Sequence, residues 1–550
     1  MGYKKKFSED KNKVTITAIG ESRGFWDRKK GDWVKEKTFE VVRKEEIYEK
    51  IKNGELIDLE DKYVKGFSLC EYRGREGLEE HEEVKLKDFN AEGAFFEAGV
   101  DFSNAVFDGD VYFSDANFGD GDIRFWRVEF GDGKVSFRRA TFGEGDVSFS
   151  KVNFGDGDTS FSYAYFGNGK VAFKGANFGD GNIYFNGTNF RGENISFSGA
   201  NFGSGETSFR FTKFEGGKVS FKRTKLKEGN AYFSQSEFGE ENVSFYRADF
   251  GGSSLQFVNI KTQGDWDMRV RQADILEFSG SKIHGNIDLG VYHWKERKEK
   301  TPQINELRLI NTKLYGKIYM DYTEFKLGRA INSQQDTIHR EKKEQFRLLK
   351  ENFRNLGQYD DEDKAYVQFM WHKIRAEGGF DIPISVNISV SNIFKAFYKY
   401  PIERSIPFYL RYYRRFCRRI GHMGKHTPFI QRAIRFPVFA FKWLVFEQMG
   451  LYGTSPARVA LSMLITLGLF ILAYIPFASP INLPENISSF SGKLINAFYH
   501  SVITFLTIGY GHDYINPQIL LGRILSGLEG FAGLFLMSYF TISFVRKVLR

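Results

Sequence analysis

The sequence predicts a multidomain chain, in which a long β-solenoid is followed by an α-helical hairpin and two membrane-spanning helices. Three observations carry this prediction. A repeat of twelve residues runs through the first half of the chain, two amphipathic segments follow it, and the last hundred residues hold two long apolar runs. We expect boundaries at 1–54, 55–330, 331–380, 381–455 and 456–550.

Phenylalanine marks the repeat at two positions in every twelve residues. One series runs from Phe113 to Phe257 and the second from Phe118 to Phe250, broken at Leu226, so the spacing alternates between five and seven. Neither spacing fits a helical period of about 3.6 residues, and the glycines of each FGxG junction weaken helices further. Short strands that end in glycine-rich turns fit better, which indicates a β-solenoid.

The residues around the second phenylalanine carry a family resemblance. A small residue precedes it by two positions, and the triplets Ala116-Asn117-Phe118 and Ala248-Asp249-Phe250 resemble the pentapeptide-repeat unit A-(D/N)-(L/F)-x-x. The resemblance implies a right-handed quadrilateral β-helix, here with two residues inserted on every second side. A coil of four sides then takes two repeats and predicts phenylalanine ladders between positions 24 apart. A two-sided coil of one repeat is the alternative, but two phenylalanines per coil would overfill it.

The ends of the solenoid are less regular. Glu46–Lys52 reads as a capping helix within an N-terminal segment, and Leu56–Leu69 as degenerate strands. The alternation of strands continues to about residue 330, with a charged loop near 291–303. No secretory signal is expected, because the first lysines are not followed by an apolar core. The two cysteines lie far apart and predict no disulfide framework.

The turns of the solenoid make Ca²⁺ a minor candidate cofactor. FGDGD at 118–122 and 154–158 is similar to glycine-aspartate calcium turns, but lysine intrudes at Lys134 and Lys170, and a calcium ladder needs uninterrupted oxygen ligands. Residues 101–258 carry 21 acidic and 17 basic residues, too balanced for the acidic rod by which some pentapeptide-repeat proteins mimic DNA. We therefore expect no nucleic-acid partner.

Two helices are predicted between the solenoid and the apolar runs. Gly357 should end the first helix, and Asp360 should be the N-cap of the second. We expect this hairpin either to cover the open end of the solenoid or to pair subunits. Its apolar stripes consist of Phe346, Leu349, Phe353 and Leu356 in the first helix and Val367, Trp371 and Ile374 in the second.

A basic block precedes the first apolar run. Between Ile384 and Pro456 there are twelve Lys/Arg and two Glu, which accounts for the net charge of +9. Interleaved basic and aromatic residues could bind nucleic acid, but their position beside a spanning segment favours a lipid headgroup surface.

Two runs are long enough to cross a lipid bilayer. Thr454-Ser455-Pro456 is typical of a helix start, and Val459–Ala478 contains no charge. We expect spans at about 457–478 and 519–545. The basic residues outside both spans place the two termini in the cytoplasm and the chain in the plasma membrane.

A short apolar helix at about 494–506 and the sequence TIGYG lie between the spans, which predicts a re-entrant loop. Its glycines allow successive carbonyls to face one axis and replace the water shell of K⁺. The filter residues Thr507, Ile508, Gly509, Tyr510 and Gly511 resemble the potassium-channel selectivity filter, with K⁺ held at the first four, and 456–550 resemble a two-transmembrane pore domain. One loop per chain then requires a homotetramer. The whole chain resembles prokaryotic pentapeptide-repeat proteins with such a domain.

The same resemblance assigns roles to the second span. Gly533 would be its hinge, and the residues lining the cavity and inner gate would be Leu534, Met537, Ser538, Thr541 and Val545. Lipid-facing side chains are the alternative for each of these five positions. Glu529, a charge at membrane depth, is expected to accept a hydrogen bond from the short helix or else to sense the gate.

The outer mouth departs from the family. His512 stands where many filters carry Asp, Asp513 follows it, and Ile503 stands where some relatives carry Glu. Because imidazole titrates near neutral pH, we expect His512 to make conduction sensitive to external pH.

These observations predict a tetrameric potassium channel whose cytoplasmic β-helix regulates gating or binds a ligand or protein. The alternative is a membrane-tethered scaffold, in which the C-terminal domain is a non-selective cation pore or an anchor. We expect no enzymatic activity, because no acid pair, nucleophile–base set or phosphate-cradling loop stands out. No arginine-rich voltage-sensing helix precedes the filter either.

Overall fold

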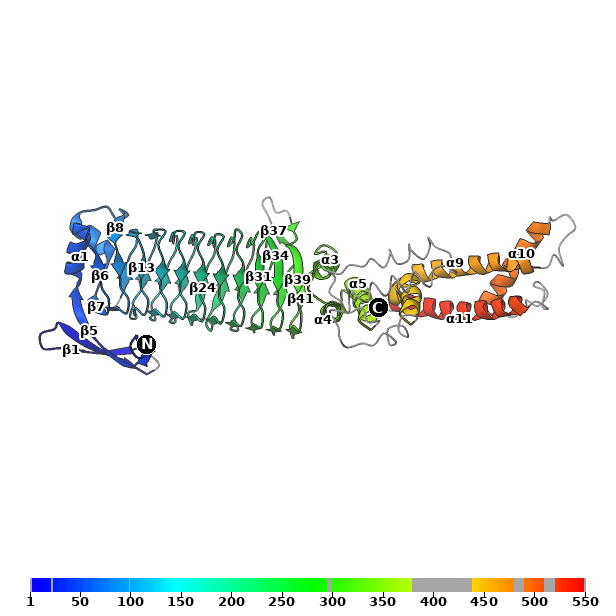
Figure 1. The fold of residues 1–550 in the computed structure, drawn as a ribbon, viewed down its shortest axis with the longest axis horizontal. Coiled ribbons are helices and arrows are strands. Elements are labelled where there is room, and N and C mark those ends of the chain that lie inside the picture. The colour runs from blue at the N-terminus through cyan, green and yellow to red at the C-terminus, as the bar shows by residue number, and fades with distance from the viewer. Residues whose placement is uncertain are drawn as a thin grey trace, which may run out of the picture. The chain divides into compact units, whose positions relative to one another are not determined.

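The structure is a computed structural model that describes residues 2–20, 23–97, 99–293, 299–377, 438–478, 489–508 and 520–548. The chain divides into two compact units, Met1–Gln334 and Gln335–Arg550. The first unit is a stack of parallel coils and the second consists of helices (Figure 1). Residues 381–437, which make up most of the predicted basic segment at 381–455, lie outside the described residues.

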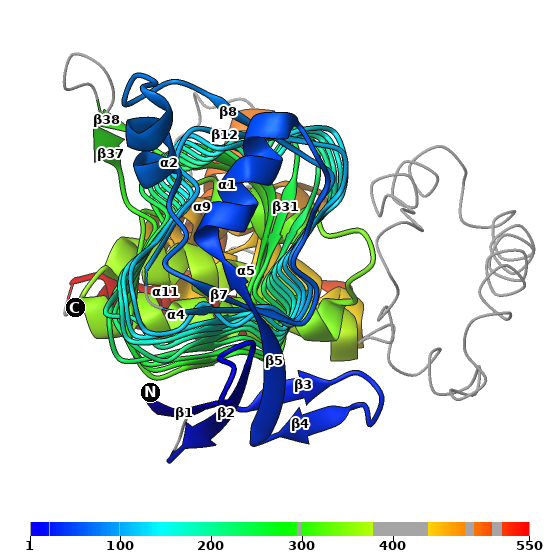
Figure 2. The same ribbon diagram turned by 90° about the vertical axis from the view of Figure 1, so that its left-hand side faces the viewer.

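The first unit is a parallel β-solenoid of about ten turns. Val111 pairs with Val135, which pairs with Thr159, so each coil takes two repeats of the sequence. This register confirms the four-sided coil and excludes the two-sided one. Figure 2 shows the solenoid along its long axis, with the sides of successive coils superposed.

Three sides of the solenoid form long sheets. The first contains β11 (Val100–Asp101), β14 (Ile123–Arg124), β18 (Val147–Ser148), β21 (Val171–Ala172), β24 (Asn194–Ser196), β27 (Lys218–Ser220), β30 (Val243–Ser244), β33 (Trp266–Asp267), β36 (Ile287–Asp288) and β41 (Ile318–Tyr319). The second contains β6 (Ile57–Asp58), β9 (Phe89–Asn90), β13 (Val111–Tyr112), β16 (Val135–Ser136), β19 (Thr159–Ser160), β22 (Ile183–Tyr184), β25 (Thr207–Ser208), β28 (Ala231–Tyr232), β31 (Ser254–Gln256), β34 (Gln272–Glu277) and β39 (Gln303–Arg308). The third contains β17 (Thr141–Phe142), β20 (Tyr165–Phe166), β23 (Asn189–Phe190), β26 (Lys213–Phe214), β29 (Glu237–Phe238), β32 (Lys261–Thr262), β35 (Lys282–Ile283) and β40 (Lys313–Leu314). The fourth side begins with β8 (Val84–Lys87), β12 (Ala105–Asp108) and β15 (Glu129–Phe130) and continues as single bridges.

Phenylalanine ladders fill the interior. The rings of Phe113 and Phe137 stack at 4.9 Å and those of Phe137 and Phe161 at 4.8 Å, in both cases within 5° of parallel. Rings one repeat apart meet edge to face, as Phe113 and Phe125 do at 85°. Both arrangements suit the quadrupoles of aromatic rings. The ladders predicted between every second repeat are therefore confirmed.

The glycines of the FGxG junctions are required by the distance between coils. A β-carbon at Gly143 would lie 1.7 Å from the carbonyl oxygen of Gly119, and one at Gly203 would lie 1.6 Å from that of Gly179. Because no side chain fits against that carbonyl, the glycine recurs in most repeats, and the exceptions are Arg191, Glu215 and Lys227.

The N-terminal end carries a sheet that the sequence reading missed. β1 (Gly2–Phe7), β2 (Lys13–Ile19) and β5 (Glu36–Arg43) pair antiparallel, and β5 then joins β7 (Lys62–Lys65) and β10 (Phe95–Glu97) in parallel. β3 (Phe25–Asp27) and β4 (Asp32–Val34) form a hairpin, and α1 (Lys44–Asn53) includes the predicted capping helix. Leu69, read as the end of a strand, begins α2 (Leu69–Glu76), because the Ser68 hydroxyl caps that helix.

Near the other end, one coil is longer than two repeats, since Lys282 pairs with Lys313 and Ile283 with Leu314. The additional residues include the hairpin of β37 (Tyr292–His293) and β38 (Glu299–Lys300), within the predicted charged loop. α3 (Leu327–Asn332) follows the last coil. Ser333 Oγ donates to the carbonyl of Asn305 at 3.1 Å, and Gln334 Nε2 donates to that of Leu307 at 2.6 Å. Two carbonyls at the open edge of β39 thus find hydrogen-bond donors within the solenoid unit.

The second unit contains α4 (His339–Leu356), α5 (Tyr359–Glu377), the π-helical turn η2 (Trp443–Gln448), the 3-10 turns η3 (Leu451–Gly453) and η4 (Ile475–Phe477), α9 (Pro456–Tyr474), α10 (Ser489–Phe505) and α11 (Leu520–Val548). Gly357 ends α4 with φ of 74°, as predicted. The predicted N-cap at Asp360 was wrong. α5 already begins at Tyr359, and Asp360 lies in its first turn. An acidic side chain there stabilises the helix, because it interacts favourably with the positive end of the helix dipole.

Candidate functional site

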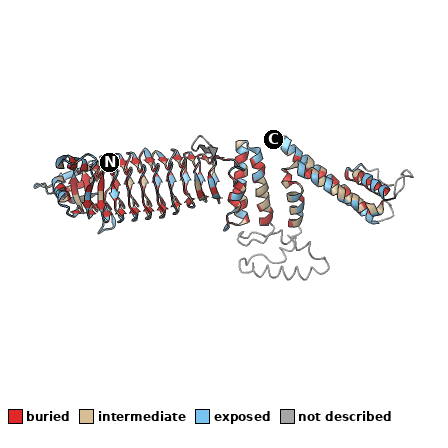
Figure 3. Cartoon of the chain, turned by 90° about the horizontal axis from the view of Figure 1, so that it is seen from above, coloured by how far each residue is buried: buried red, intermediate tan, exposed pale blue. Residues whose placement is uncertain are grey.

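α9 and α11 frame the site. The segments Pro456–Phe477 and Leu520–Val548 are long and apolar enough to cross a membrane. The Ser455 hydroxyl accepts from the backbone N–H of Arg458, and Pro456 follows the cap, which confirms the predicted helix start. Much of the surface of α9 and α11 is exposed within one chain (Figure 3). These surfaces are free to meet lipid or further copies of the chain.

α10 is a short helix that packs against both spans. Ala497 lies in a buried cluster with Tyr474 and Ala478, and Leu525 of α11 packs on that cluster. The helix begins at Ser489, five residues before the predicted start at 494, because the prediction followed the apolar run, while the polar first turn is also helical. α10 ends at Phe505, one residue before the predicted end, and only Leu506 separates it from TIGYG.

The end of α10 has a defined geometry. The backbone N–H of Thr507 donates to the carbonyl of Thr504 at 3.1 Å, and that of Ile508 donates to Ile503 at 3.0 Å. Thr507 has a φ of 59°, so these bonds form a Schellman ending in which a β-branched residue occupies the left-handed position. Such a residue is unusual there and is held by its surroundings. Of the predicted filter, Gly509, Tyr510 and Gly511 lie outside the described residues, as do His512 and Asp513.

Gly533 of α11 packs directly against this end of α10, which is thereby seated on it. A β-carbon at Gly533 would lie 2.1 Å from the carbonyl oxygen of Phe505, the last residue of α10. Backbone therefore meets backbone at the point where α10 passes into the predicted filter. The resemblance gave Gly533 the role of a hinge, which stays a prediction, and the structure adds a packing reason for glycine at this position.

A buried polar cluster joins α10 to α11. The hydroxyl of Ser501 donates to Oε1 of Glu529, and both side chains are fully buried. This is the hydrogen bond expected for Glu529. Beside this pair, His500 Nε2 lies 2.9 Å from the hydroxyl of Ser526, which is about one turn before Glu529 on α11. The ring of Tyr474 meets the ring of His500 edge to face, with 4.9 Å between their centres. Sequence reasoning missed His500 and Ser501, although two adjacent polar residues inside an apolar run were a usable signal.

The predicted cavity residues share the face of α11 that one chain leaves largely exposed. Leu534 and Val545 are 56% and 45% exposed, whereas Leu536, Tyr539 and Ser543 are buried against the rest of the unit. Among the predicted hydroxyl-bearing residues, Ser538 donates to the carbonyl of Leu534 and Thr541 to that of Met537. The structure thus groups these residues on one face, and whether they line a pore stays a prediction.

The last turn of α11 contacts α5. Arg546 Nη2 lies 2.7 Å from Oδ1 of Asp363, and Lys547 Nζ lies 2.5 Å from Oδ1 of Asp360. The hydrogen bond from Lys547 lowers the pKa of the Asp360 carboxyl. These four residues connect the second predicted span to the helical hairpin.

A second contact joins α5 to the turns before α9. Arg375 Nη1 lies 3.3 Å from Oε2 of Glu447, which also accepts from the Tyr452 hydroxyl at 3.0 Å. Burial lowers the pKa of Arg375, while Glu447 opposes that shift. Burial, and then the charge of Glu447, raises the pKa of Tyr452.

Among the described residues, no three acidic, histidine or cysteine side chains gather as metal ligands. In the solenoid turns, Asp122 Oδ1 accepts from the backbone N–H of Asp146 at 3.1 Å, and Asp146 Oδ1 accepts from that of Lys170 at 2.8 Å. Each carboxylate thus bonds the next coil. The turns have a structural role in the ladder that does not depend on Ca²⁺.

Residues 459–550 match the family of ion channels. The match begins inside α9 and runs to the end of the chain, so it includes α10, the TIGYG sequence and α11. An ion channel domain therefore occupies the C-terminal part of the chain. No curated protein and no solved structure was found to match the chain.

Proposed function

From the ion channel domain at 459–550, we propose that the chain forms a potassium-selective channel as a homotetramer in the plasma membrane. The observation that carries this proposal is the order α10, TIGYG, α11, with the end of α10 seated on Gly533. Carbonyls at the C-terminal end of α10 carry partial negative charge directed along the helix axis, which favours a cation beyond it. Each chain supplies one such loop, so four copies complete the ring.

The filter residues are Thr507, Ile508, Gly509, Tyr510 and Gly511, with K⁺ coordinated at the first four. Glycine at two of these positions lets successive carbonyls point to the axis. The Ser501–Glu529 hydrogen bond supports the filter from behind, by tying α10 to α11 about one turn before the end of α10.

Regulation enters through the helical hairpin. Asp360 and Asp363 of α5 hold Lys547 and Arg546 at the end of α11, so a change in the hairpin moves the end of the second span. With both termini cytoplasmic, the β-solenoid is the domain that receives a signal, and α5 is the connection by which it reaches the pore.

The test is K⁺ against Na⁺ flux into liposomes that contain the purified full-length protein. We expect K⁺-selective flux in the unchanged protein and its loss in Gly509→Ala. Gly527→Ala is the matched control, because a β-carbon at that helical position meets nothing within 4 Å. Native mass spectrometry of the detergent-solubilised protein should give four chains.

Equal K⁺ and Na⁺ flux would contradict potassium selectivity and favour the non-selective pore. Should the unchanged protein show no flux, a variant without residues 1–330 separates a closed gate from a scaffold. Flux after deletion supports a gated channel, and continued absence of flux contradicts the proposal.

A further inference from the structure

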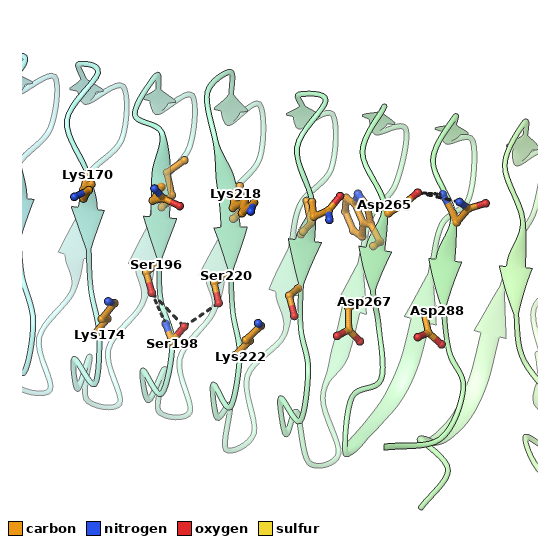
Figure 4. Close-up of a pocket in the computed structure, with 18 of the residues that line it drawn as sticks. Lys170, Lys174, Ser196, Ser198, Lys218, Ser220, Lys222, Asp265, Asp267 and Asp288 are labelled. Atoms are coloured by element: carbon orange, nitrogen blue, oxygen red, sulfur yellow. Dashed lines mark hydrogen bonds between the residues drawn. The ribbon is translucent and has the colours of Figure 1, made fainter. Parts of the chain in front are cut away.

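A groove of about 1010 Å³ runs along the first side of the solenoid, over β21 to β41 (Figure 4). Its floor consists of small outward-facing side chains on neighbouring strands, among them Ser196, Ser220 and Ser244. Because these hydroxyls are short, the longer side chains on either side stand above them as walls. This volume is that of a small-molecule site.

Four lysines surround the first part of the groove. Lys170 and Lys218 lie in one row and Lys174 and Lys222 in the other, on opposite sides of the serine floor (Figure 4). Within each row the two lysines are two coils apart, or about 10 Å at the usual spacing of strands. In the part of the chain that the structure describes, no carboxylate forms an ion pair with any of these four side chains.

The carboxylates of the groove are already engaged. Arg269 Nε lies 2.8 Å from Asp267 and 3.2 Å from Asp288, and Asp265 accepts from the backbone and side-chain amides of Asn286. Arg269 offsets one of the two charges of Asp267 and Asp288, and Asp265 meets only neutral amides. The groove is therefore divided, with the positive charge of the four lysines in its first part and the remaining negative charge in its second part.

Hydroxyl groups lie between these lysines. Ser198 Oγ lies 2.8 Å from Ser220 Oγ and 3.1 Å from Ser196 Oγ, across two coils. Figure 4 places this cluster between Lys174 and Lys222. Hydroxyls and ammonium groups are donors to phosphate oxygens, and bonds from a charged donor are the stronger ones.

The positive patch is short. In the row of Lys170 and Lys218, the preceding coils carry Asp122 and Asp146, and the coil beyond Asn242 carries Asp265. A long polyanion would have to cross these carboxylates, which costs electrostatic energy. A ligand that covers the three coils from Lys170 to Lys218 meets the lysines, the serines and Asn194, and no carboxylate that lines the groove.

We propose that this groove binds a small soluble molecule with a di- or triphosphate group, of the class of nucleoside triphosphates. The phosphates lie over Ser196, Ser198 and Ser220 between the four lysines. The remainder extends towards Asn242 and Asp265, where amide and carboxylate oxygens accept hydrogen bonds from hydroxyl and amino groups. Lys170, one of the lysines that interrupt the aspartate turns, thus serves an anion. This site is independent of the pore, and its test does not depend on ion flux.

The test is isothermal titration calorimetry on the full-length protein in detergent, without divalent cations, using ATP and inorganic triphosphate as probes. We expect both to bind, and ATP more tightly. The double variant Lys174→Gln/Lys222→Gln should weaken binding of each probe by about a hundred-fold, since each of the two lost bonds from a charged donor is worth about ten-fold. Ser198→Asp, which places a carboxylate at the centre, should abolish it.

Lys213→Gln/Lys225→Gln is the matched control, with the same change of charge on two other sides of the solenoid. The four lysines changed in the two double variants, Lys174, Lys222, Lys213 and Lys225, are all exposed, so both variants should melt like the unchanged protein. Binding that is absent at millimolar probe overturns the proposal. So does an equal loss in the control pair, because the charge of the whole domain would then account for it.

Discussion

Arg546, near the end of α11, forms an ion pair at 2.7 Å with Asp363, in the first turns of α5. The guanidinium also lies over the ring of Tyr366, 4.2 Å from its centre. The side chains of the pair are 20% and 12% exposed, whereas those of the neighbouring Lys547–Asp360 pair are 49% and 80% exposed. The two pairs bridge the same elements, so they form an internal comparison of a shielded and an exposed contact.

Asp363→Ala should lower stability more than Asp360→Ala. The first leaves a partly buried guanidinium without its carboxylate and should cost about 1–3 kcal/mol. The second removes an exposed pair that is worth well under about 1 kcal/mol. Thermal unfolding of the purified protein, followed by hydrogen exchange in α5 and the end of α11, measures both.

The exchanged pair Asp363→Arg/Arg546→Asp is the control for this contact. It should recover at least half of the loss caused by Asp363→Arg alone. Equal losses in Asp363→Ala and Asp360→Ala would show that Asp363 and Arg546 do not hold α11 to α5.

Gly533→Ala should disturb the filter. Its β-carbon would meet the Phe505 carbonyl at 2.1 Å, so α10 must shift and carry Thr507 with it. We expect a lower ratio of K⁺ to Na⁺ flux, with Gly527→Ala as the control. A change of open probability at constant selectivity would instead favour a hinge at Gly533 and contradict its role as the seat of α10.

Glu529→Ala and Glu529→Gln separate a hydrogen bond from a charge. Glutamine keeps an oxygen that accepts from Ser501, whereas alanine leaves that hydroxyl without its partner. We expect Glu529→Ala and Ser501→Ala to destabilise the domain by about 1–3 kcal/mol and to reduce selectivity, and Glu529→Gln to be nearly neutral. If glutamine is as damaging as alanine in melting and flux, the negative charge is the property that matters.

The regular part of the fold could be predicted because its physics repeats. Each phenylalanine meets the same neighbours as its counterpart two repeats away, so a single pattern in the sequence specified every coil in which two twelve-residue repeats make one turn. The N-terminal sheet was missed, although KVTITAI alternates so that Val14 and Ile16 are fully buried. This alternating run is only seven residues long and occurs once, so its signal is weak beside that of the phenylalanine repeat. Tertiary pairing with β5 then decided its structure.

The candidate site was predictable where one segment carries it and not where segments meet. TIGYG between two apolar runs is local, as is the cap at Ser455. The pairing of Arg546 with Asp363 joins residues 183 apart and that of Ser501 with Glu529 joins residues 28 apart. No periodicity links such positions. The sequence could suggest only that a buried Glu needs a donor, and packing of α10 on α11 supplied Ser501.

Leu226→Phe should stabilise the solenoid. Leu226 is buried at the one place where the second series lacks phenylalanine, and Phe202 and Phe250 occupy the same position one coil before and one coil after it. A ring at Leu226 would stack on both, and each stacked pair contributes about 0.5–1.5 kcal/mol. We expect a higher melting temperature and, for comparison, a loss of about 3–5 kcal/mol in Phe161→Ala. A lower melting temperature in Leu226→Phe would show that this coil is narrower than its neighbours.

Acidification should loosen the α4–α5 hairpin through His372. Its Nδ1 lies 2.8 Å from Nδ1 of His339, so one ring must donate to the other. Burial, and then the charges of His339, Lys342 and Arg375, hold the pKa of His372 well below its usual value. The folded hairpin therefore keeps His372 neutral, while the unfolded chain binds a proton below about pH 6.5, so stability is lost as the pH falls through that value.

Hydrogen exchange of α4 and α5 peptides between about pH 7.5 and 5.5, on either side of the usual pKa of histidine and corrected for intrinsic rates, measures this loss. We expect protection to fall in the unchanged protein and to change less in His372→Phe, whose ring takes the place of an imidazole stacked on Phe346. His81→Gln, at an exposed position of the solenoid unit, is the control and should follow the unchanged protein. An unaltered pH dependence in His372→Phe would contradict this role, because proton uptake by another group would then account for the loss.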